Sequence, residues 1–253
     1  MPGSHGNFVW YELMTTDPEA AKRFYGTVVG WTLQEMSNAG MPYTILMAGD
    51  QMAAGLMGMP PEAKGAPPNW MGYVGVDDVD AACEKVKSLG GSVHMPPRDI
   101  PNMGRFAVLT DPQGAFFSVY KGNNEGQALP AMDAPRRIGW HELYANDWEK
   151  LFAFYSALFG WQKAEAVPMG EMGVYQIFSY AGDTRGGMFN KPKEIPVCFW
   201  LYYFTVPDFD AATGRVTSAG GKIMNGPMQV PGGSWIVQCQ DPQGAMFALV
   251  GQK

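Results

Sequence analysis

The feature that most constrains this chain is an internal repeat with an offset of 130 residues. The run Trp10-Tyr11-Glu12-Leu13 returns as Trp140-His141-Glu142-Leu143, and the run Asp111-Pro112-Gln113-Gly114 returns as Asp241-Pro242-Gln243-Gly244. The register slips only in the middle of each half and has recovered by Trp200, which repeats Trp70. A repeat of this length indicates one domain that occurs twice rather than a short-period solenoid array.

Each half also repeats one order of elements within itself. A strand at Phe8–Met14 precedes a helix that Asp17 caps and Pro18 begins, and short apolar runs between turn residues then predict three strands. The same order follows from Trp70, with Asp78 as the helix cap, and again in the second half. The pattern therefore predicts an α+β fold of four βαβββ modules, paired into two tandem domains.

The stretch between the two copies has no apolar periodicity and is rich in Gly, Asn, Ala and Pro, which is typical of a linker. We therefore expect a first domain at residues 1–121 with modules at 6–60 and 69–121, a linker at 122–137, and a second domain at 138–253 with modules at 138–192 and 197–251.

Composition narrows the class of protein. The net charge of −6 and the absence of a long Lys/Arg cluster argue against a nucleic-acid partner. No apolar run is long enough for a signal peptide or a membrane span, so we expect a cytoplasmic protein. We expect it to be a monomer or a homodimer. Cys83, Cys198 and Cys239 are scattered and do not share repeat positions, which predicts reduced core thiols.

Two motifs carry a family resemblance. Both halves contain Phe-Tyr followed five residues later by Gly-Trp, and the run 99–115 leads into the Asp-Pro-Gln-Gly turn. In these features the chain resembles the vicinal oxygen chelate superfamily, which includes glyoxalase I, extradiol dioxygenases and the fosfomycin- and bleomycin-resistance proteins. It is most similar to tandem bacterial members described as glyoxalase-like proteins or hydroxylases, including a mycobacterial antigen. The resemblance implies a U-shaped sheet in each half that forms a cup.

The resemblance also implies His and Glu ligands for a divalent metal on the cavity face of metal-using members, a set that suits Fe, Zn, Ni or Mn. This sequence departs from that pattern, because the residues at the family's ligand positions include tryptophan, methionine and alanine. Their indole, thioether and methyl groups do not hold a hard cation. We therefore expect no metal cofactor. The family positions correspond to Trp10, Met71 and Ser118 in the first half and to Trp140, Leu201 and Ala248 in the second.

Glu12 and Glu142 are the candidate catalytic residues. Each follows a tryptophan by two positions and so shares a strand face with it. A carboxylate that faces an apolar cup has a raised pKa and can act as a general acid or base, although an ion pair between domains would explain the same residues. His141 is the alternative metal ligand, and we expect His5 to lie in a flexible terminus.

Strand alternation extends the candidate ligand-binding surface. Aromatic side chains supply stacking surface, and Arg105, which the repeat replaces with Trp235, suggests that the two cups differ. The expected ligand-binding residues are Trp10, Tyr73, Arg105, Ser118, Tyr120, Trp140 and Tyr203.

Three functions are compatible with these residues. The first is a metal-independent protein that binds a small aromatic or apolar molecule in a cup, similar to the bleomycin-resistance proteins. The second is an enzyme, namely a lyase, hydroxylase or dioxygenase, that uses Glu12 or Glu142 as acid or base or an atypical metal site. The third is a structural protein whose duplicated cups bind nothing.

Overall fold

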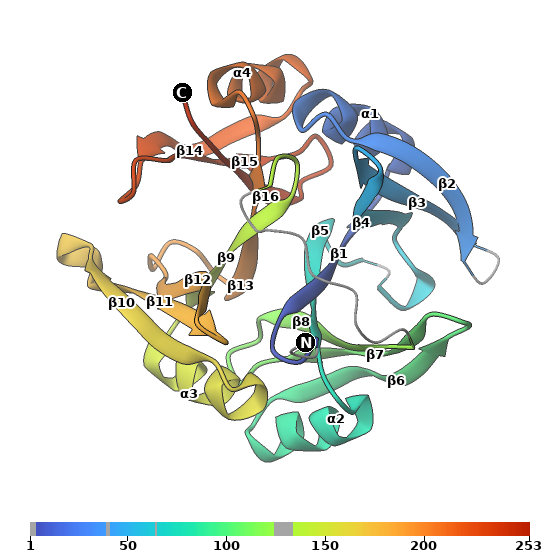
Figure 1. Cartoon of the computed structure of the whole chain (residues 1–253), viewed down its shortest axis with the longest axis vertical. Coiled ribbons are helices and arrows are strands. Elements are labelled where there is room, and N and C mark those ends of the chain that lie inside the picture. Colours follow the sequence, from blue (N-terminus) through green and yellow to red (C-terminus); the bar gives the residue numbers. More distant parts are fainter. Residues whose placement is uncertain (1–3, 39–40, 64, 124–133) are drawn as a thin grey trace. The chain divides into compact units, whose positions relative to one another are not determined.

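The computed structural model describes residues 4–38, 41–63, 65–123 and 134–253 (Figure 1). The first half consists of β1 (Phe8–Thr15), α1 (Pro18–Val28), β2 (Thr32–Asn38), β3 (Met41–Ala48), β4 (Gln51–Gly58), β5 (Asn69–Gly75), α2 (Val79–Ser88), β6 (Ser92–Ile100), β7 (Gly104–Thr110) and β8 (Phe116–Gly122). The second half consists of β9 (Ile138–Ala145), α3 (Trp148–Phe159), β10 (Gln162–Pro168), β11 (Val174–Tyr180), β12 (Asp183–Asn190), β13 (Phe199–Thr205), α4 (Phe209–Ser218), β14 (Lys222–Gln229), β15 (Trp235–Gln240) and β16 (Met246–Gly251).

Four modules repeat one strand arrangement, which confirms the predicted α+β fold. In each module the last three strands form an antiparallel meander, and the first strand pairs in parallel with the last. In module one the order is β2-β3-β4-β1, and in module two it is β5-β8-β7-β6. Trp10 and Trp140 occupy the same place in β1 and β9, so the repeat in sequence is a repeat in structure.

The helices begin where the aspartates predict. Asp17 accepts a hydrogen bond from Ala20 N at 3.0 Å, and Pro18 takes the first helical position of α1. Asp78, Asp147 and Asp208 cap the other three helices in the same way. Each carboxylate satisfies a backbone N–H that has no partner inside the helix, which typically contributes about 1 kcal/mol.

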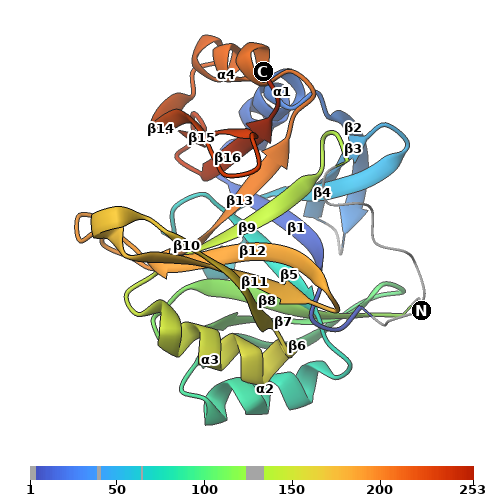
Figure 2. The ribbon, with the colours of Figure 1, turned by 60° about the vertical axis from the view of Figure 1, so that its left-hand side comes forward.

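The chain forms two compact units that do not coincide with its tandem halves. The first unit comprises Met1–Val9, Met71–Leu129 and His141–Trp200, and the second comprises Trp10–Trp70, Pro130–Trp140 and Leu201–Lys253. The first unit thus combines modules two and three, with α2 beside α3, and the second combines modules one and four, with α1 beside α4 (Figures 1 and 2). The division into domains at residues 1–121 and 138–253 stays a prediction.

An aromatic cluster fills the core of each unit. In the second unit Tyr25 is fully buried and lies edge-on to Trp70 and Phe247. In the first unit Tyr155 makes the corresponding edge contacts with Trp200 and Phe117. The Phe-Tyr motif is therefore a core motif, because its tyrosine contacts aromatic rings from two different strands of its unit. The three cysteines are also free and buried, as expected.

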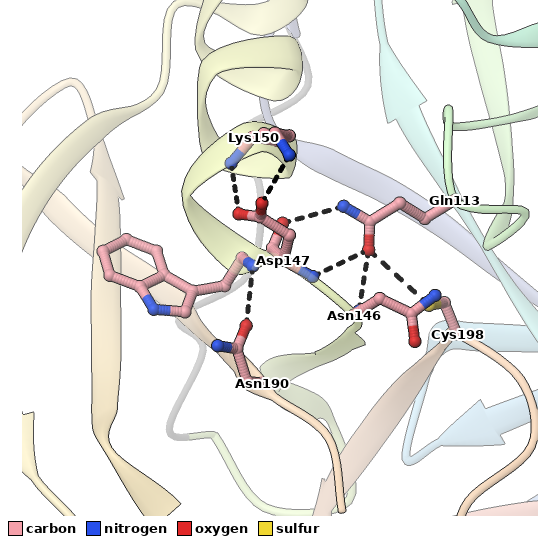
Figure 3. A network of polar contacts seen from close by, with 7 residues as sticks. Gln113, Asn146, Asp147, Lys150, Asn190 and Cys198 are labelled. Carbon is pink, nitrogen blue, oxygen red and sulfur yellow. Dashed lines mark hydrogen bonds and ion pairs between the residues drawn. The ribbon is translucent and has the colours of Figure 1, made fainter. Parts of the chain in front are cut away.

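A glutamine from the turn after β7 joins the two modules of the first unit (Figure 3). Gln113 Oε1 accepts hydrogen bonds from Asn146 N at 2.7 Å and Asp147 N at 3.0 Å, and Gln113 Nε2 donates to Asp147 O at 2.8 Å. Cys198 Sγ lies 3.8 Å from the same Oε1. One side chain from module two thus satisfies the backbone at the start of α3 in module three.

Residues 5–7, directly before β1, are bonded into the first unit, which corrects the expectation that His5 lies in a flexible terminus. Gly6 N donates to Gly75 O at 2.9 Å, Gly75 N donates to Asn7 O at 2.8 Å, and Trp161 Nε1 donates to Gly6 O at 2.7 Å. These bonds fix the backbone on either side of Gly6, and His5 Nδ1 lies 3.3 Å from an Asp77 carboxylate oxygen.

The end of the predicted linker is bonded into the second unit, as the residues directly before β1 are bonded into the first. Arg136 N and Thr205 O, and Thr205 N and Arg137 O, each form a bond of 2.7 Å, and Trp31 Nε1 donates to Arg136 O at 2.8 Å. The last residues of the linker, which adopt turn and bend conformations, therefore form backbone hydrogen bonds with β13. Most of the remaining linker, residues 124–133, lies outside the described residues.

Candidate functional site

A chain of two hydrogen bonds connects an indole to a carboxylate in module one. Trp10 Nε1 donates to Tyr43 Oη at 3.1 Å, and Tyr43 Oη donates to Glu12 Oε2 at 2.9 Å. Trp10 and Glu12 are two residues apart on β1 and both are partly exposed, whereas Tyr43 on β3 is buried. The strand alternation that predicted a shared face for Trp10 and Glu12 thus brings both side chains to one phenol.

A glycine makes this contact possible. Gly55 on β4 lies between Glu12 on β1 and Ile45 on β3 in the sheet. A Cβ atom at Gly55 would overlap with Tyr43 Oη, so the absence of a side chain leaves the path along which the phenol reaches Glu12.

The first unit contains the same arrangement in module three. Tyr175 Oη on β11 donates to Glu142 Oε2 at 3.1 Å, and Glu142 is buried. Gly187 pairs with Glu142 on one side and with Ile177 on the other, and a Cβ atom there would overlap with the Tyr175 ring. The duplication has therefore kept a tyrosine–glutamate pair, and the glycine that accommodates it, in both halves of the chain.

The surroundings keep the Tyr43 phenol protonated. Burial, and then the negative charge of Glu12, raise the pKa of Tyr43 well above its ordinary value. A protonated phenol is the form that can donate to a carboxylate, and a hydrogen bond to an ionised acceptor is stronger than one between neutral groups. In this pair the protonated phenol of Tyr43 thus donates to the carboxylate of Glu12.

Reasoning from sequence missed both tyrosines and both glycines. Their signal is present: Tyr43-x-Ile45 returns as Tyr175-x-Ile177, and Gly55 returns as Gly187, each with an offset of 132 residues rather than 130. Because the hairpins of the meander differ in length, these residues drop out of the register that aligns the first strands.

Four of the predicted ligand-binding residues lie in module two, and three of them contact residues of their own module. Tyr73 is buried opposite Ser118 on the neighbouring strand, with its ring centroid 6.1 Å from that of Phe106. Ser118 is fully buried, and its hydroxyl lies 2.9 Å from Met71 Sδ. Tyr120 Oη donates to Met103 O at 2.8 Å, and partial burial raises the pKa of Tyr120. In this structure the three side chains bond to or pack against their own module.

Arg105 is held by two carboxylates. Its Nε and one Nη donate to Asp80 at 2.7 and 3.1 Å, and the other Nη donates to Asp99 at 2.8 Å. The repeat places Trp235 at this position, where Lys253 Nζ lies 3.8 Å from the ring centroid and 3.5 Å from Asp210. In module two the cation of Arg105 therefore reaches Asp80 at the start of α2, and in module four the cation of Lys253 reaches Asp210 at the start of α4. The exchange of Arg105 for Trp235 changes only which residue supplies the cation.

The remaining two predicted residues belong to the second unit. Trp140 is partly exposed in β9. Tyr203 is buried in β13, and its hydroxyl accepts a hydrogen bond from Gln238 Nε2 at 3.0 Å.

His141 packs as a core residue. Its ring stacks on Phe8 with centroids 3.8 Å apart and planes within 8°, and Nδ1 donates to Arg185 O. Burial lowers the pKa of His141 to about 3, so the imidazole is neutral at physiological pH. These contacts fit a structural role for His141 better than the alternative of a metal ligand.

The family's metal positions do not offer a donor set for a hard divalent cation. Leu201 and Ala248 are fully buried and carry no donor atom, and the hydroxyl of Ser118 faces the thioether of Met71. Within the part of the chain that the structure describes, no three His, Cys, Asp or Glu side chains are grouped so that they could hold a metal ion. The side chains at the family's metal positions therefore do not fit the divalent metal ion that the resemblance implies.

Comparison with known proteins agrees with the fold. The chain is 34% identical over 246 residues to "Putative glyoxylase CFP32" of Mycobacterium tuberculosis, covering 95% of this chain and 93% of the relative. It is 30% identical over 260 residues to the anthracycline biosynthesis protein DauV of a Streptomyces species, with coverage of 95% and 91%. Among the described residues, no helix is long and apolar enough to cross a membrane.

Solved structures share the architecture at low identity. The Mn(II)-bound glyoxalase from Novosphingobium aromaticivorans superposes with a TM-score of 0.68 at 16% identity, over 99% of this chain and 83% of that one. The 2,3-dioxygenase LapB from Pseudomonas sp. KL28 superposes with a TM-score of 0.65 at 13% identity, over 96% and 90%. At such identities the likeness concerns the fold alone.

The model of one family matches the chain twice, at residues 7–119 and 137–249, and so covers both halves. This chain is a tandem member of the Glyoxalase/Bleomycin resistance protein/Dioxygenase superfamily.

Proposed function

We propose that this chain is a metal-independent small-molecule-binding member of the superfamily, and that it takes a planar aromatic ligand against Trp10 and, in the second half, against Trp140. The observation that carries the proposal is the partly exposed indole of Trp10, whose N–H is bonded to Tyr43 and through it to Glu12. An indole fixed in this way offers a rigid aromatic face for stacking, which adds about 0.5–1.5 kcal/mol beyond the burial of area.

The chemistry of the family positions supports binding without a metal. Trp10 and Trp140 stand where metal-using relatives carry ligands, and neither indole can coordinate a divalent cation. A relative named for anthracycline biosynthesis, at 30% identity, is compatible with a planar polycyclic ligand. Such a molecule presents a large aromatic face and a few polar groups at its edge, which suits an indole beside a phenol.

A second function has one observation in its favour. The hydrogen bond of 2.9 Å between Tyr43 Oη and Glu12 Oε2 is the geometry of an acid–base pair, as would be needed by an enzyme that moves a proton on its ligand. The two functions make different demands on Glu12, since binding needs an acceptor while catalysis needs a group that takes up and releases a proton.

Substitutions separate the two functions. Trp10→Ala and Trp140→Ala should weaken the binding of a planar quinone such as anthraquinone, measured by fluorescence quenching, by about tenfold if each removes about 1.4 kcal/mol of stacking and packing. Glu12→Gln and Glu142→Gln should leave anthraquinone binding within about twofold. Undiminished binding in both tryptophan variants would refute the proposal, and turnover that Glu12→Gln abolishes without loss of binding would establish the enzyme instead.

A further inference from the structure

The phenol of Tyr43 has hydrogen-bonding capacity beyond the two bonds described above. A phenol carries one proton and two acceptor lone pairs. The proton goes to Glu12 Oε2, and one lone pair accepts from Trp10 Nε1. Among the residues that the structure describes, no further donor reaches this oxygen, so its second lone pair has no partner there.

The position of this oxygen suits ligand recognition. It lies 3.1 Å from the polar edge of the Trp10 indole and 2.9 Å from the Glu12 carboxylate, and both of those side chains are partly exposed. A flat ring stacked on Trp10 would therefore bring its own edge near Tyr43 Oη. A hydroxyl group on that edge could donate to the phenol oxygen.

The glutamate makes this phenol a better acceptor than an isolated tyrosine. A hydroxyl that donates to a carboxylate becomes more negative at its oxygen, because hydrogen bonds in a chain polarise one another. The raised pKa of Tyr43 keeps its proton in place, so the oxygen remains a neutral hydroxyl directed at Glu12. Gly55 preserves this geometry, because any side chain there would displace the phenol.

We propose that Tyr43 is a specificity-determining residue that selects planar aromatic ligands carrying a ring hydroxyl, such as phenols and hydroxyquinones, over the same rings without one. The ligand O–H donates to Tyr43 Oη while Tyr43 donates to Glu12. Tyr175, with Glu142 and Gly187, forms the corresponding tyrosine–glutamate pair in module three. This inference rests on the proposed function and adds to it the chemical class of the ligand.

A pair of matched probes tests the proposal. Anthraquinone and 2-hydroxyanthraquinone differ by one hydroxyl that is too far from the quinone oxygens to bond internally, and both are measured at a pH at which that hydroxyl keeps its proton. The wild-type protein should bind the hydroxylated probe about tenfold more tightly, which corresponds to about 1.4 kcal/mol. The variant that combines Tyr43→Phe with Tyr175→Phe should lose this preference, so that the dissociation constants of the two probes agree within about twofold, whatever affinity both probes lose because the Trp10 indole no longer has its acceptor.

Two further variants guard the interpretation. Gly55→Ala keeps the Tyr43 hydroxyl but displaces it from Glu12, so it should reduce the preference in the same direction as Tyr43→Phe. Tyr180→Phe, which alters a partly exposed tyrosine beside Gly6, should leave the preference as it is in the wild type.

The outcomes distinguish this inference from the proposed function. Binding of both probes with an unchanged preference in the double tyrosine variant overturns the selection by Tyr43 and Tyr175 and leaves the proposed function standing. Failure of the wild-type protein to bind either probe overturns the proposed function, and this inference with it.

Discussion

Tyr25 Oη donates a hydrogen bond of 3.0 Å to Asp241 Oδ2, although the two residues are 216 positions apart in the sequence. Tyr155 Oη makes the matching bond of 2.9 Å to Asp111 Oδ2 in the other unit. Each tyrosine comes from the first helix of a half, and each aspartate from the Asp-Pro-Gln-Gly turn of the opposite half. The two sequence motifs that best mark the repeat are therefore partners in the structure.

Removal of a tyrosine hydroxyl should destabilise its unit. Tyr25→Phe leaves Asp241 Oδ2 and Trp70 Nε1 without their shared partner in a buried core, and an unsatisfied buried polar group costs about 1–3 kcal/mol. We expect a loss of about 2 kcal/mol in the free energy of unfolding, measured by urea denaturation. Tyr155→Phe should cost a similar amount, and Tyr180→Phe is the control. A loss below about 0.5 kcal/mol in both core variants would contradict this account.

The two turn glutamines should differ in their contribution to stability. Gln113→Ala removes three hydrogen bonds to the backbone at the start of α3 (Figure 3), so a loss of about 2 kcal/mol is expected. Gln243 stands at the same place in the repeat, but its buried Oε1 has no hydrogen-bond partner among the described residues. Gln243→Ala should therefore cost less than about 0.5 kcal/mol in the same measurement. Equal losses would show that the two turns are joined to their helices in the same way.

His141 should make stability depend on pH in a defined window. Its folded pKa of about 3 lies below the ordinary value of 6.5, so the unfolded chain binds more protons between those values. The free energy of unfolding is thus fully retained above about pH 6.5 and falls as the pH drops towards 3, by up to about 1.4 kcal/mol per pH unit from this group.

The measurement compares the wild-type protein with His141→Gln by urea denaturation at several pH values in that window. The difference in stability between the two proteins should narrow as the pH falls, because only the wild-type protein loses the contribution of a buried neutral imidazole. Curves that stay parallel across the window would show that His141 is not buried in its neutral form.

Local structure was largely predictable from the sequence. The aspartate caps, the proline at the start of α1 and the turn chemistry act within a few residues, so helices and modules followed from the pattern. The identity of the first-strand residues Trp10 and Glu12 as neighbours on one face followed from strand alternation alone.

Contacts between distant segments were not predictable in the same way. The pairing of module one with module four depends on contacts such as Tyr25–Asp241, which no local pattern encodes. The hydrogen bond between Tyr43 and Glu12 depends on the position of Tyr43 along β3, which places its phenol beside Gly55. The hairpins of the two halves differ slightly in length, so the offset of 130 residues does not align Tyr43 with Tyr175. The hydrogen bond from Trp161 Nε1 to Gly6 O likewise joins two distant segments, so no local pattern predicts it.

The most direct test of the central claim is a calorimetric titration of 2-hydroxyanthraquinone into protein treated with a chelator, repeated after addition of Mn(II), Fe(II), Ni(II) or Zn(II). If Trp10 and Tyr43 bind the ligand without a metal, the dissociation constants with and without each ion should agree within about twofold. Binding that appears only when one metal ion per chain is restored would contradict the claim.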